Sequence, residues 1–263
     1  MYKKQTMLSQ NKIKFIRSLD AKKNRQHHNC FVVEGEKMVL ELLQSNFEII
    51  DLYVLSDFLS SHAKLINKGV AVTEILEFEL KKISSLKTPN MALAIAKIPD
   101  HKYDQHSYDS LTLALDNIQD PGNFGTLIRT ANWFGVTTIF CSNDTVDAYN
   151  SKVVQSTMGA IFRTKIIYVD LLQTLIDAKK RGQIIYGTLL DGDNLYTADL
   201  KNTGLIVLGN ESNGISKAIQ NLIDKKIRIP NFPEDVKTME SLNVGIANAI
   251  VLAEFRRQVN NFS

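Results

Sequence analysis

The sequence is poor in cysteine and has no long hydrophobic run. Cys30 and Cys141 are the two cysteines among 263 residues, too few and too distant for a disulfide framework or a C-x-x-C metal or redox site. The longest nearly apolar stretch, 244–253, has ten residues, whereas a membrane span needs about twenty. No apolar segment follows the lysine-led N-terminus to make it a signal peptide. We therefore expect a soluble, cytoplasmic protein in a reducing compartment, without a membrane partner.

Glycine is nearly absent from the first part of the chain. Two of the thirteen glycines lie in the first hundred residues, and the other eleven follow Pro121. Between these two regions, residues 99–109 are polar and show no apolar period, which indicates a linker. The sequence thus predicts two domains, 1–98 and 110–263, joined by this linker.

Positive charge is concentrated at the N-terminal end. Residues 1–28 hold eight Lys or Arg residues and one acid, a net charge of +7, and the remaining 235 residues carry a net charge of −4. Clusters of Lys and Arg bind phosphate backbones by neutralising charge and releasing counterions. A solvated basic helix that keeps the protein soluble would look the same. If the segment binds RNA, we expect contacts from Lys12, Lys14, Arg17, Lys22, Lys23 and Arg25.

Apolar runs alternate with amphipathic segments along the chain, which predicts an α/β protein with mostly parallel sheets. In the first domain we expect strands at 31–33, 49–55, 70–72 and 91–96, and helices at 9–19, 35–43, 57–66 and 76–83. In the second we expect strands at 111–115, 136–141, 165–169, 183–188, 205–208 and 226–229. One helix of this domain is expected to end at 134, and the others to lie near 151–158, 171–181, 216–222 and 242–258.

Polar residues and turn formers meet where the strand over 111–115 ends. Asn117, Asp120 and Asn123 crowd the turn, and Arg129 lies one to two helical turns further on. Ligands of parallel α/β proteins bind beyond the carboxyl ends of strands, where helix N-termini present free N–H groups. A plain turn would explain the proline and the glycines here. It does not explain Asn117 or Arg129, whose charge needs a partner or a substrate, although a solvated arginine remains an alternative.

A glycine-bounded loop follows the apolar strand at 205–208. Gly209 and Gly214 have the spacing of a phosphate-binding loop, but Ile215 stands where its lysine should be. A G-x-G-x-x-G dinucleotide motif is absent as well. The loop could approach a ligand closely and carries one acid, Glu211. A strand-to-helix turn without any function would have the same appearance.

A third conspicuous region combines the string 227–230 with the segment 241–250. Ser241 is suited to cap a helix that begins after it. The small residues that follow permit close backbone packing, as a purely structural helix interface also would; they are Gly245, Ala247, Ala249 and Ala253.

In their order and form the three regions resemble a known family. The strings DNIQDPGNFGTLIRTANWFG, IVLGNESNGIS and IRIP…ESLNVGIANAIVLAEF resemble motifs 1, 2 and 3 of the SpoU/TrmH family of RNA ribose 2′-O-methyltransferases. The N-terminal IKFIRSL…KKNR…FVVEGEKMVLELL resembles the small ribosomal-protein-like domain that binds substrate and often precedes the catalytic domain. The resemblance implies a SPOUT α/β domain with a deep trefoil knot, which is rare in proteins, and a homodimer formed through the C-terminal domain.

The resemblance also implies a cofactor and a set of site residues. S-adenosylmethionine would be held, largely through backbone groups, by Leu208, Gly209, Asn210, Gly214, Ile229, Pro230, Ser241, Leu242 and Asn243. The catalytic residues would be Asn123, Arg129, Glu211, Ser241 and Asn243. The partner would be structured RNA, ribosomal more than transfer RNA. The five histidines show no metal-ligand spacing, so no metal is expected.

The expected reaction is an in-line displacement of the sulfonium by a ribose 2′ oxygen. Family members are thought to use the arginine of motif 1, here Arg129, to remove the proton from that hydroxyl. A guanidinium has a pKa above 12 and accepts no hydrogen bond. We therefore expect Arg129 to grip the target phosphate and to stabilise developing negative charge, with proton removal as the rival role.

Two departures from the family pattern and two alternative functions stay open. Ser212 stands where many relatives have glycine, and serine would cost about 1 kcal/mol if the position needs a positive φ. Segment 231–240 looks longer than in compact relatives, so the cover over the cofactor is expected to differ. One alternative is a non-catalytic RNA-binding or ribosome-assembly protein with the same fold. A weaker one is a nucleotide-binding enzyme that uses the loop 209–214.

Overall fold

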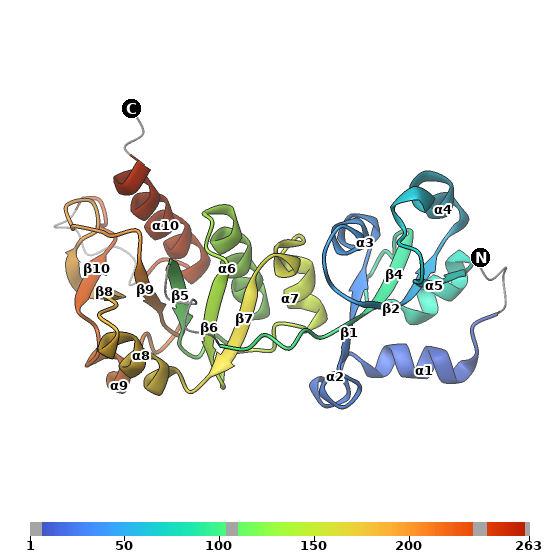
Figure 1. Ribbon diagram of the computed structural model, residues 1–263, viewed down its shortest axis with the longest axis horizontal. Coiled ribbons are helices and arrows are strands. Elements are labelled where there is room, and N and C mark those ends of the chain that lie inside the picture. Colours follow the sequence, from blue (N-terminus) through green and yellow to red (C-terminus); the bar gives the residue numbers. More distant parts are fainter. Residues whose placement is uncertain (1–6, 104–109, 234–240, 261–263) are drawn as a thin grey trace. The chain divides into compact units, whose positions relative to one another are not determined.

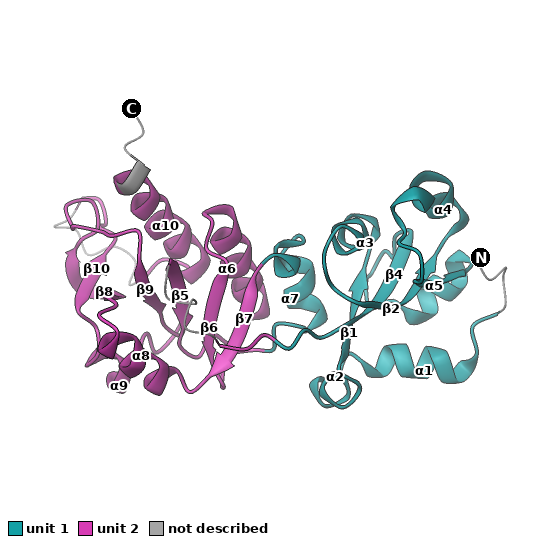
Figure 2. Ribbon diagram, viewed as in Figure 1, with its two compact units in different colours: residues 1–100, 147–163 teal, residues 101–146, 164–263 magenta. Residues whose placement is uncertain are grey.

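The computed structural model describes residues 7–103, 110–233 and 241–260, which form two compact units (Figure 2). Unit 1 consists of residues 1–100 and 147–163, and unit 2 of residues 101–146 and 164–263. A segment from the second half of the chain thus packs with the first hundred residues. Three parts of the sequence discussed above lie outside the described residues. They are Lys3 and Lys4 of the basic end, residues 104–109 of the expected linker, and residues 234–240 of the segment expected to be long in motif 3.

Unit 1 is built on a four-stranded sheet of order β1-β4-β2-β3 (Figure 1). Its strands are β1 (Cys30–Glu34), β2 (Ile49–Val54), β3 (Ala71–Glu74) and β4 (Ala92–Lys97). β4 is antiparallel to β1 and β2, and only β2 and β3 are parallel. The expectation of mostly parallel sheets is therefore wrong for this unit. A buried central strand such as β4 has a continuous apolar run in either direction, because periodicity reports burial and not orientation.

The helices of unit 1 follow the expected pattern with one exception. They are α1 (Gln10–Ser18), α2 (Lys22–His28), α3 (Glu36–Leu43), α4 (Ser56–His62), α5 (Glu77–Ile83) and α7 (Ser151–Ser156), with short 3-10 turns at Ala63–Leu65 and Ala160–Phe162. α1 is capped by Ser9 and buries Ile13 and Ile16. α2 was not predicted, because it contains no apolar residue and buries Arg25 instead.

Aromatic rings fix the inserted segment 147–163 within unit 1. The ring centroids of Phe31 and Tyr149 are 4.7 Å apart, and those of Phe47 and Phe162 are 5.3 Å apart. Phe31 is fully buried and Tyr149 and Phe162 are nearly so. Such pairs contribute area burial plus a favourable ring–ring geometry. The segment therefore completes the core of this unit.

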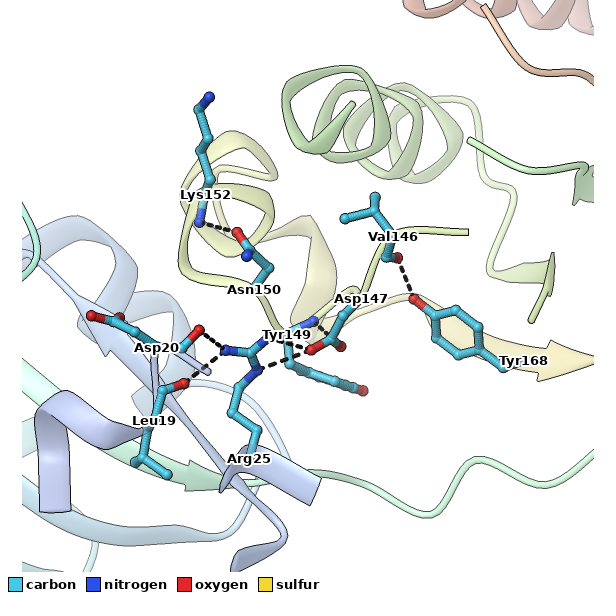
Figure 3. A network of polar contacts seen from close by, with 9 residues as sticks. All are labelled: Leu19, Asp20, Arg25, Val146, Asp147, Tyr149, Asn150, Lys152 and Tyr168. Atoms are coloured by element: carbon cyan, nitrogen blue, oxygen red, sulfur yellow. Dashed lines mark hydrogen bonds and ion pairs between the residues drawn. The ribbon is translucent and has the colours of Figure 1, made fainter. Parts of the chain in front are cut away.

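A buried ion pair connects the same segment to α2 (Figure 3). Both Nε and Nη2 of Arg25 donate to Oδ2 of Asp147, at 2.9 and 2.5 Å. The remaining nitrogen, Nη1, donates to the carbonyl oxygens of Leu19 and Asp20, each at 2.7 Å. The backbone N–H of Tyr149 donates to the other carboxylate oxygen of Asp147 at 3.0 Å. The charges of both partners are thus satisfied inside the unit.

Unit 2 has an all-parallel sheet of order β10-β8-β9-β5-β6-β7 (Figure 1). Its strands are β5 (Leu111–Leu115), β6 (Thr138–Ser142), β7 (Lys165–Val169), β8 (Ile185–Asn194), β9 (Gly204–Leu208) and β10 (Lys225–Arg228). Its helices are α6 (Pro121–Trp133), α8 (Leu171–Lys180), α9 (Lys217–Gln220) and α10 (Val244–Asn260). The α/β architecture with a parallel sheet is as expected.

The order of strands places a switch point between β5 and β9. The chain leaves β5 towards β6 on one side, and β9 lies on the other side of β5. In open parallel sheets, ligands bind at the carboxyl ends of strands at such a point. The loops that follow β5 and β9 carry the first two regions singled out in the sequence.

α6 and α10 pack against each other and bring the third region to the first. Gly245 permits this contact, because a Cβ there would come within 2.8 Å of Cγ2 of Thr126. Further along the interface, Nδ2 of the buried Asn248 donates to Oγ1 of Thr130 at 2.9 Å. Near the end of α10, Nε of Arg256 donates to the carbonyl oxygen of Phe134 at 2.7 Å. The start of α10 is thereby fixed beside α6.

Candidate active site

The ends of β5 and β9 are tied together by polar contacts. Asp116, the residue after β5, accepts the N–H of Ser216 at its Oδ2 (2.7 Å), and its own N–H donates to the carbonyl oxygen of Leu208 (2.9 Å). Nδ2 of Asn210 donates to the carbonyl oxygen of Asn117 at 2.8 Å. Asp116 was not named as a site residue in the sequence analysis. Its position directly after a buried strand was the signal that could have identified it. These bonds set the distance between the two loops.

The loop after β9 is held rigid by its own asparagine. Asn210 and Gly214 exchange backbone hydrogen bonds of 3.0 and 2.8 Å. Oδ1 of Asn210 also accepts the N–H groups of Ser212 and Asn213, at 2.9 and 3.0 Å. A Cβ at Gly209 would collide with the backbone of Gly214. In this loop Gly214 has a positive φ and Ser212 does not. Serine at position 212, where many relatives have glycine, therefore causes no backbone strain.

Three side chains, one from each region, form a continuous hydrogen-bonded row. Nδ2 of Asn123 donates to Oε1 of Glu211 at 3.0 Å. Nδ2 of Asn243 donates to Oδ1 of Asn123 at 2.9 Å. The three residues are 32 to 120 positions apart in the chain, yet their functional groups are within hydrogen-bond distance of their neighbours. Asn123 is the residue that connects the three regions.

The orientation of both amides is determined by backbone groups. Oδ1 of Asn243 accepts the N–H groups of Gly245 (2.9 Å) and Ile246 (3.3 Å), so Asn243 caps α10 and its Nδ2 must face Asn123. Ser241 was expected to be this cap, and that prediction is wrong because α10 begins two residues later. The amide of Asn123 must then turn its own Nδ2 towards the carboxylate of Glu211. The row therefore runs in one direction, from the N-terminus of α10 to this acid.

Arg129 lies on the outer face of α6, with Thr126 and Trp133. Its apolar sequence neighbours Leu127 and Ile128 point to the opposite, buried face. Within the described parts of the chain, the exposed guanidinium makes no hydrogen bond or ion pair. Although apolar residues surround Arg129 in the sequence, its charge does not lie among their buried side chains. The cation is instead presented to solvent and is available to an anionic ligand.

An apolar cavity of about 140 Å³ lies where β8, β10 and the start of α10 meet. It is lined by Thr188, Leu189, Leu190, Leu195, Ile227, Arg228, Ile229, Ser241, Leu242, Ala247 and Val251. Three of the expected cofactor residues are in this lining, namely Ile229, Ser241 and Leu242. The others are not: Leu208 ends β9, Gly209, Asn210 and Gly214 belong to the loop after it, and Pro230 and Asn243 flank lining residues in the chain.

The lining and its surroundings fit S-adenosylmethionine. Aliphatic side chains suit a planar base, and small-molecule sites combine such walls with a few placed polar groups. Ser241 and Leu242 border the cavity, and the next residue, Asn243, begins the polar row. A ligand with an apolar ring at one end and a charged, reactive centre at the other would meet both environments.

A larger cavity of about 830 Å³ lies between the end of α6 and the second half of α10. It is lined by Trp133, Phe134, Gly135, Tyr196, Ile250, Ala253, Glu254, Arg256 and Arg257. None of the polar residues that join the three regions is among them. Its size alone does not make it the active site, because the groups that could perform chemistry are elsewhere. Its rim includes Trp133, whose side chain is 84% exposed.

The six cations expected to contact RNA differ in their availability. Four of them are exposed, and their side chains make no hydrogen bond or ion pair to the described residues: Lys14, Arg17, Lys22 and Lys23. Lys12 is half-buried, and its Nζ lies 2.9 Å from Oδ2 of Asp51. Arg25 is 2% exposed and its guanidinium is fully occupied. Its prediction as an RNA contact is wrong, because the sequence does not show that a basic residue can be the core of a short helix.

Two further observations concern metals and membranes. In the ranges 7–103, 110–233 and 241–260, no cluster of three or more His, Cys, Asp or Glu side chains could hold a metal ion. Over these same ranges, no helix is long and apolar enough to span a bilayer.

Comparison with protein families agrees with the fold. The α/β domain with a parallel sheet is similar to solved structures of the TrmH family. Residues 110–253 match the SpoU rRNA Methylase family, and residues 10–94 match the MRM3-like substrate binding domain. The first match covers more than half of the chain, and the chain belongs to the SpoU rRNA methylase family. The resemblance found in the motifs is confirmed.

Individual relatives extend over nearly the whole chain. The 23S rRNA (guanosine(2553)-2′-O)-methyltransferase RlmP of Bacillus subtilis is 28% identical over 246 residues, which are 93% of this chain and 96% of that protein. A TrmH-family structure from Porphyromonas gingivalis has a TM-score of 0.87 and 36% identity, with 96% of this chain and 100% of that chain covered. The AdoMet-bound rRNA methyltransferase from Sinorhizobium meliloti has a TM-score of 0.84 and 28% identity, with 98% of both chains covered.

Proposed function

We propose that this protein is an S-adenosylmethionine-dependent methyltransferase that modifies a ribose 2′-hydroxyl of ribosomal RNA. The observation that carries this function is the row Asn243–Asn123–Glu211, which joins all three family motifs beside an apolar cavity. The names of the B. subtilis and S. meliloti relatives describe this activity, substrate class and cofactor for those proteins. We further propose that the protein acts in the cytoplasm.

Each residue of the row has a role in this reaction. Bound S-adenosylmethionine would supply a methyl group on a sulfonium, and the ribose oxygen would bond to the methyl carbon as the carbon–sulfur bond breaks. Asn243 and Asn123 orient the carboxylate of Glu211, so that one of its oxygens can accept a hydrogen bond from the ribose hydroxyl and then its proton. Ser241 and Leu242 border the cavity that would hold the base of the cofactor. Most of the rate enhancement would come from holding the reacting atoms about 3–3.5 Å apart.

Arg129 would grip the target phosphate. Its guanidinium is exposed and without an ion pair among the described residues, as a phosphate-binding cation must be before substrate arrives. It would also stabilise negative charge that develops on the ribose oxygen. Removal of the hydroxyl proton by Arg129 remains the rival role.

Residues 1–98 would bind the RNA, and residues 110–263 would perform the chemistry. The four exposed cations of α1 and α2 support the first assignment, because unpaired Lys and Arg neutralise phosphates most readily. Two copies would pair through the C-terminal domain. The exposed Trp133 on α6 and Ile246 on α10 support this, since exposed large apolar side chains occur at interaction surfaces. We further propose the deep trefoil knot of the family for 110–263.

Methyl transfer from labelled S-adenosylmethionine to total ribosomal RNA tests the activity. We expect the wild type to label one ribose, and the Asn123→Ala variant to lose labelling while it still binds S-adenosylhomocysteine in calorimetry. Arg129→Ala should lose transfer in the same way. Retained transfer in Arg129→Ala would contradict both of its roles. RNA binding without any transfer by the wild type would favour a non-catalytic assembly protein.

Sedimentation of the wild type and of Trp133→Glu tests the pairing. We expect a dimer for the wild type and a monomer for the variant, because a buried carboxylate without a partner is costly. A dimer in both would contradict the proposed face.

A further inference from the structure

Three aromatic rings gather on the outside of α1 and α2 in unit 1. The ring centroids of Phe15 and His28 are 5.0 Å apart, and those of His28 and His27 are 4.7 Å apart. Both pairs pack edge to face, with interplanar angles of 86° and 79°. Phe15 is half-buried against the core, whereas both histidines are exposed. Edge-to-face packing leaves ring faces available, so this row can stack with a further planar group.

Basic side chains lie beside these rings or on the same helix. Nζ of Lys12 lies 5.7 Å from the ring centroid of Phe15. Lys22 and Lys23 begin the same helix that ends with the two histidines, and both are exposed without a partner among the described residues. Proteins that bind unpaired nucleic acid combine such cations, which follow the phosphates, with rings on which the bases stack.

The short helix that carries the histidines is firmly anchored. α2 has seven residues, too few to be stable by itself in water. The four hydrogen bonds of Arg25 to Asp147, Leu19 and Asp20 hold it in place (Figure 3). A helix that is fixed before binding loses little backbone conformational entropy when a ligand arrives. The helix that carries the two histidines is thus organised in advance.

We propose that Phe15, His28 and His27 form a stacking site for unpaired bases of the substrate RNA, with Lys22 and Lys23 contacting the adjoining phosphates. The inference rests on the proposed function, and it adds that unit 1 recognises a single-stranded part of the RNA. Bases within a regular duplex are already stacked on each other and could not use these rings.

Binding of two labelled RNA probes to the full-length protein tests the proposal. One probe is a hairpin with an unpaired loop, and the other is the blunt duplex of the same stem. The His27→Ala/His28→Ala variant should bind the hairpin at least about fivefold more weakly at every salt concentration. Its salt dependence and its affinity for the duplex should not change. The His27→Phe/His28→Phe variant, which keeps the rings, should restore hairpin binding.

The Lys22→Ala/Lys23→Ala variant is the matched control on the same helix. Loss of phosphate contacts should flatten the plot of log affinity against log salt, by about 0.7 for each contact on a single strand. Unchanged hairpin affinity in the histidine variant, an equal loss for the duplex, or a changed salt slope would each overturn the stacking site. So would a wild type that binds neither probe.

A fluorescent base separates stacking from a structural effect. 2-Aminopurine in the hairpin loop should be quenched on binding by the wild type, and not by the histidine variant at saturating protein. Equal quenching would overturn the proposal even if the affinity fell.

Failure of the wild type to methylate rRNA would contradict the proposed function and leave these binding results standing. Failure of the stacking site would leave S-adenosylhomocysteine binding and the rate of transfer at saturating RNA intact.

Discussion

The two units use polar side chains in opposite ways. In unit 1 the ion pair of Arg25 and Asp147 is largely buried and holds a distant segment in place. In unit 2 the row Asn243–Asn123–Glu211 is partly open to solvent and gathers at the ends of strands. The first arrangement is structural and the second is available to a ligand. Burial, more than residue type, therefore separates a basic residue that supports the fold from one that binds RNA.

The largest expected effect is on unit 1. Arg25→Ala should destabilise this unit by about 3–5 kcal/mol, because it leaves a largely buried carboxylate on Asp147 without its partner. Each unit contains one buried cysteine, Cys30 in unit 1 and Cys141 in unit 2, and burial raises the pKa of both thiols. Thiol labelling followed by peptide mass analysis therefore reports the opening of each unit separately.

We expect Arg25→Ala to speed labelling of Cys30 and to leave that of Cys141 unchanged. The double variant Arg25→Met/Asp147→Leu should recover much of the loss, since it removes both charges and retains volume. Equal acceleration at both cysteines would show that the ion pair does not belong to unit 1 alone.

The next effect is on catalysis in unit 2. Asn123→Asp should lower the single-turnover rate of methyl transfer about 100-fold or more. The new carboxylate would face that of Glu211 at the place of a 3.0 Å hydrogen bond and could not donate to it. Stability should change little, because an acid in the first turn of α6 is favourable. Asn132→Asp, the same change at the other end of this helix, should keep the rate; an equal fall would refute the role of Asn123.

A smaller effect is expected where α6 and α10 touch. Gly245→Ala should cost about 1–3 kcal/mol, because the added Cβ would lie 2.8 Å from Cγ2 of Thr126. Faster labelling of Cys141, at an unchanged rate for Cys30, would report this loss of stability. Adding Thr126→Ser removes that methyl group and should return part of the stability. If the double variant is less stable than Gly245→Ala alone, the close contact is not the cause.

The smallest effect sharpens the comparison with Arg25. Glu41 and Arg163 also connect the inserted segment to the first hundred residues, with Oε2 and Nη1 2.6 Å apart, but their side chains are 37% and 49% exposed. Glu41→Ala should therefore cost no more than about 1 kcal/mol. Chemical denaturation of this variant beside Arg25→Ala measures the difference. A loss as large as that of Arg25→Ala would mean that burial is not what distinguishes the two pairs.

The sequence predicts the strands and most helices well, because their apolar periods are clear. The motif residues Asn123, Glu211 and Asn243 could be named from the family resemblance, and the fold and family are confirmed. The row that they form could not be foreseen. It depends on the close packing of α6 on α10, and on an amide orientation that two backbone N–H groups at the start of α10 impose.

The errors of the sequence analysis have identifiable causes. α2 contains no apolar residue, so periodicity could not detect a helix whose buried side chain is Arg25. The mixed sheet of unit 1 was missed because β4 is buried on both faces and resembles a parallel strand. The partnership of residues 147–163 with unit 1 depends on pairs more than a hundred positions apart, which no local pattern records.

The inserted segment 147–163 has a consequence for recombination between the two parts of the chain. A fragment cut at the linker would keep Phe31 and Phe47 but lose Tyr149 and Phe162, the rings that cover them. The same cut would leave the buried guanidinium of Arg25 without the carboxylate of Asp147. A recombination joint at the linker would therefore separate side chains that pack together. A recombinant that joined this first half to another catalytic half would have to bring an acid and two rings at matching places.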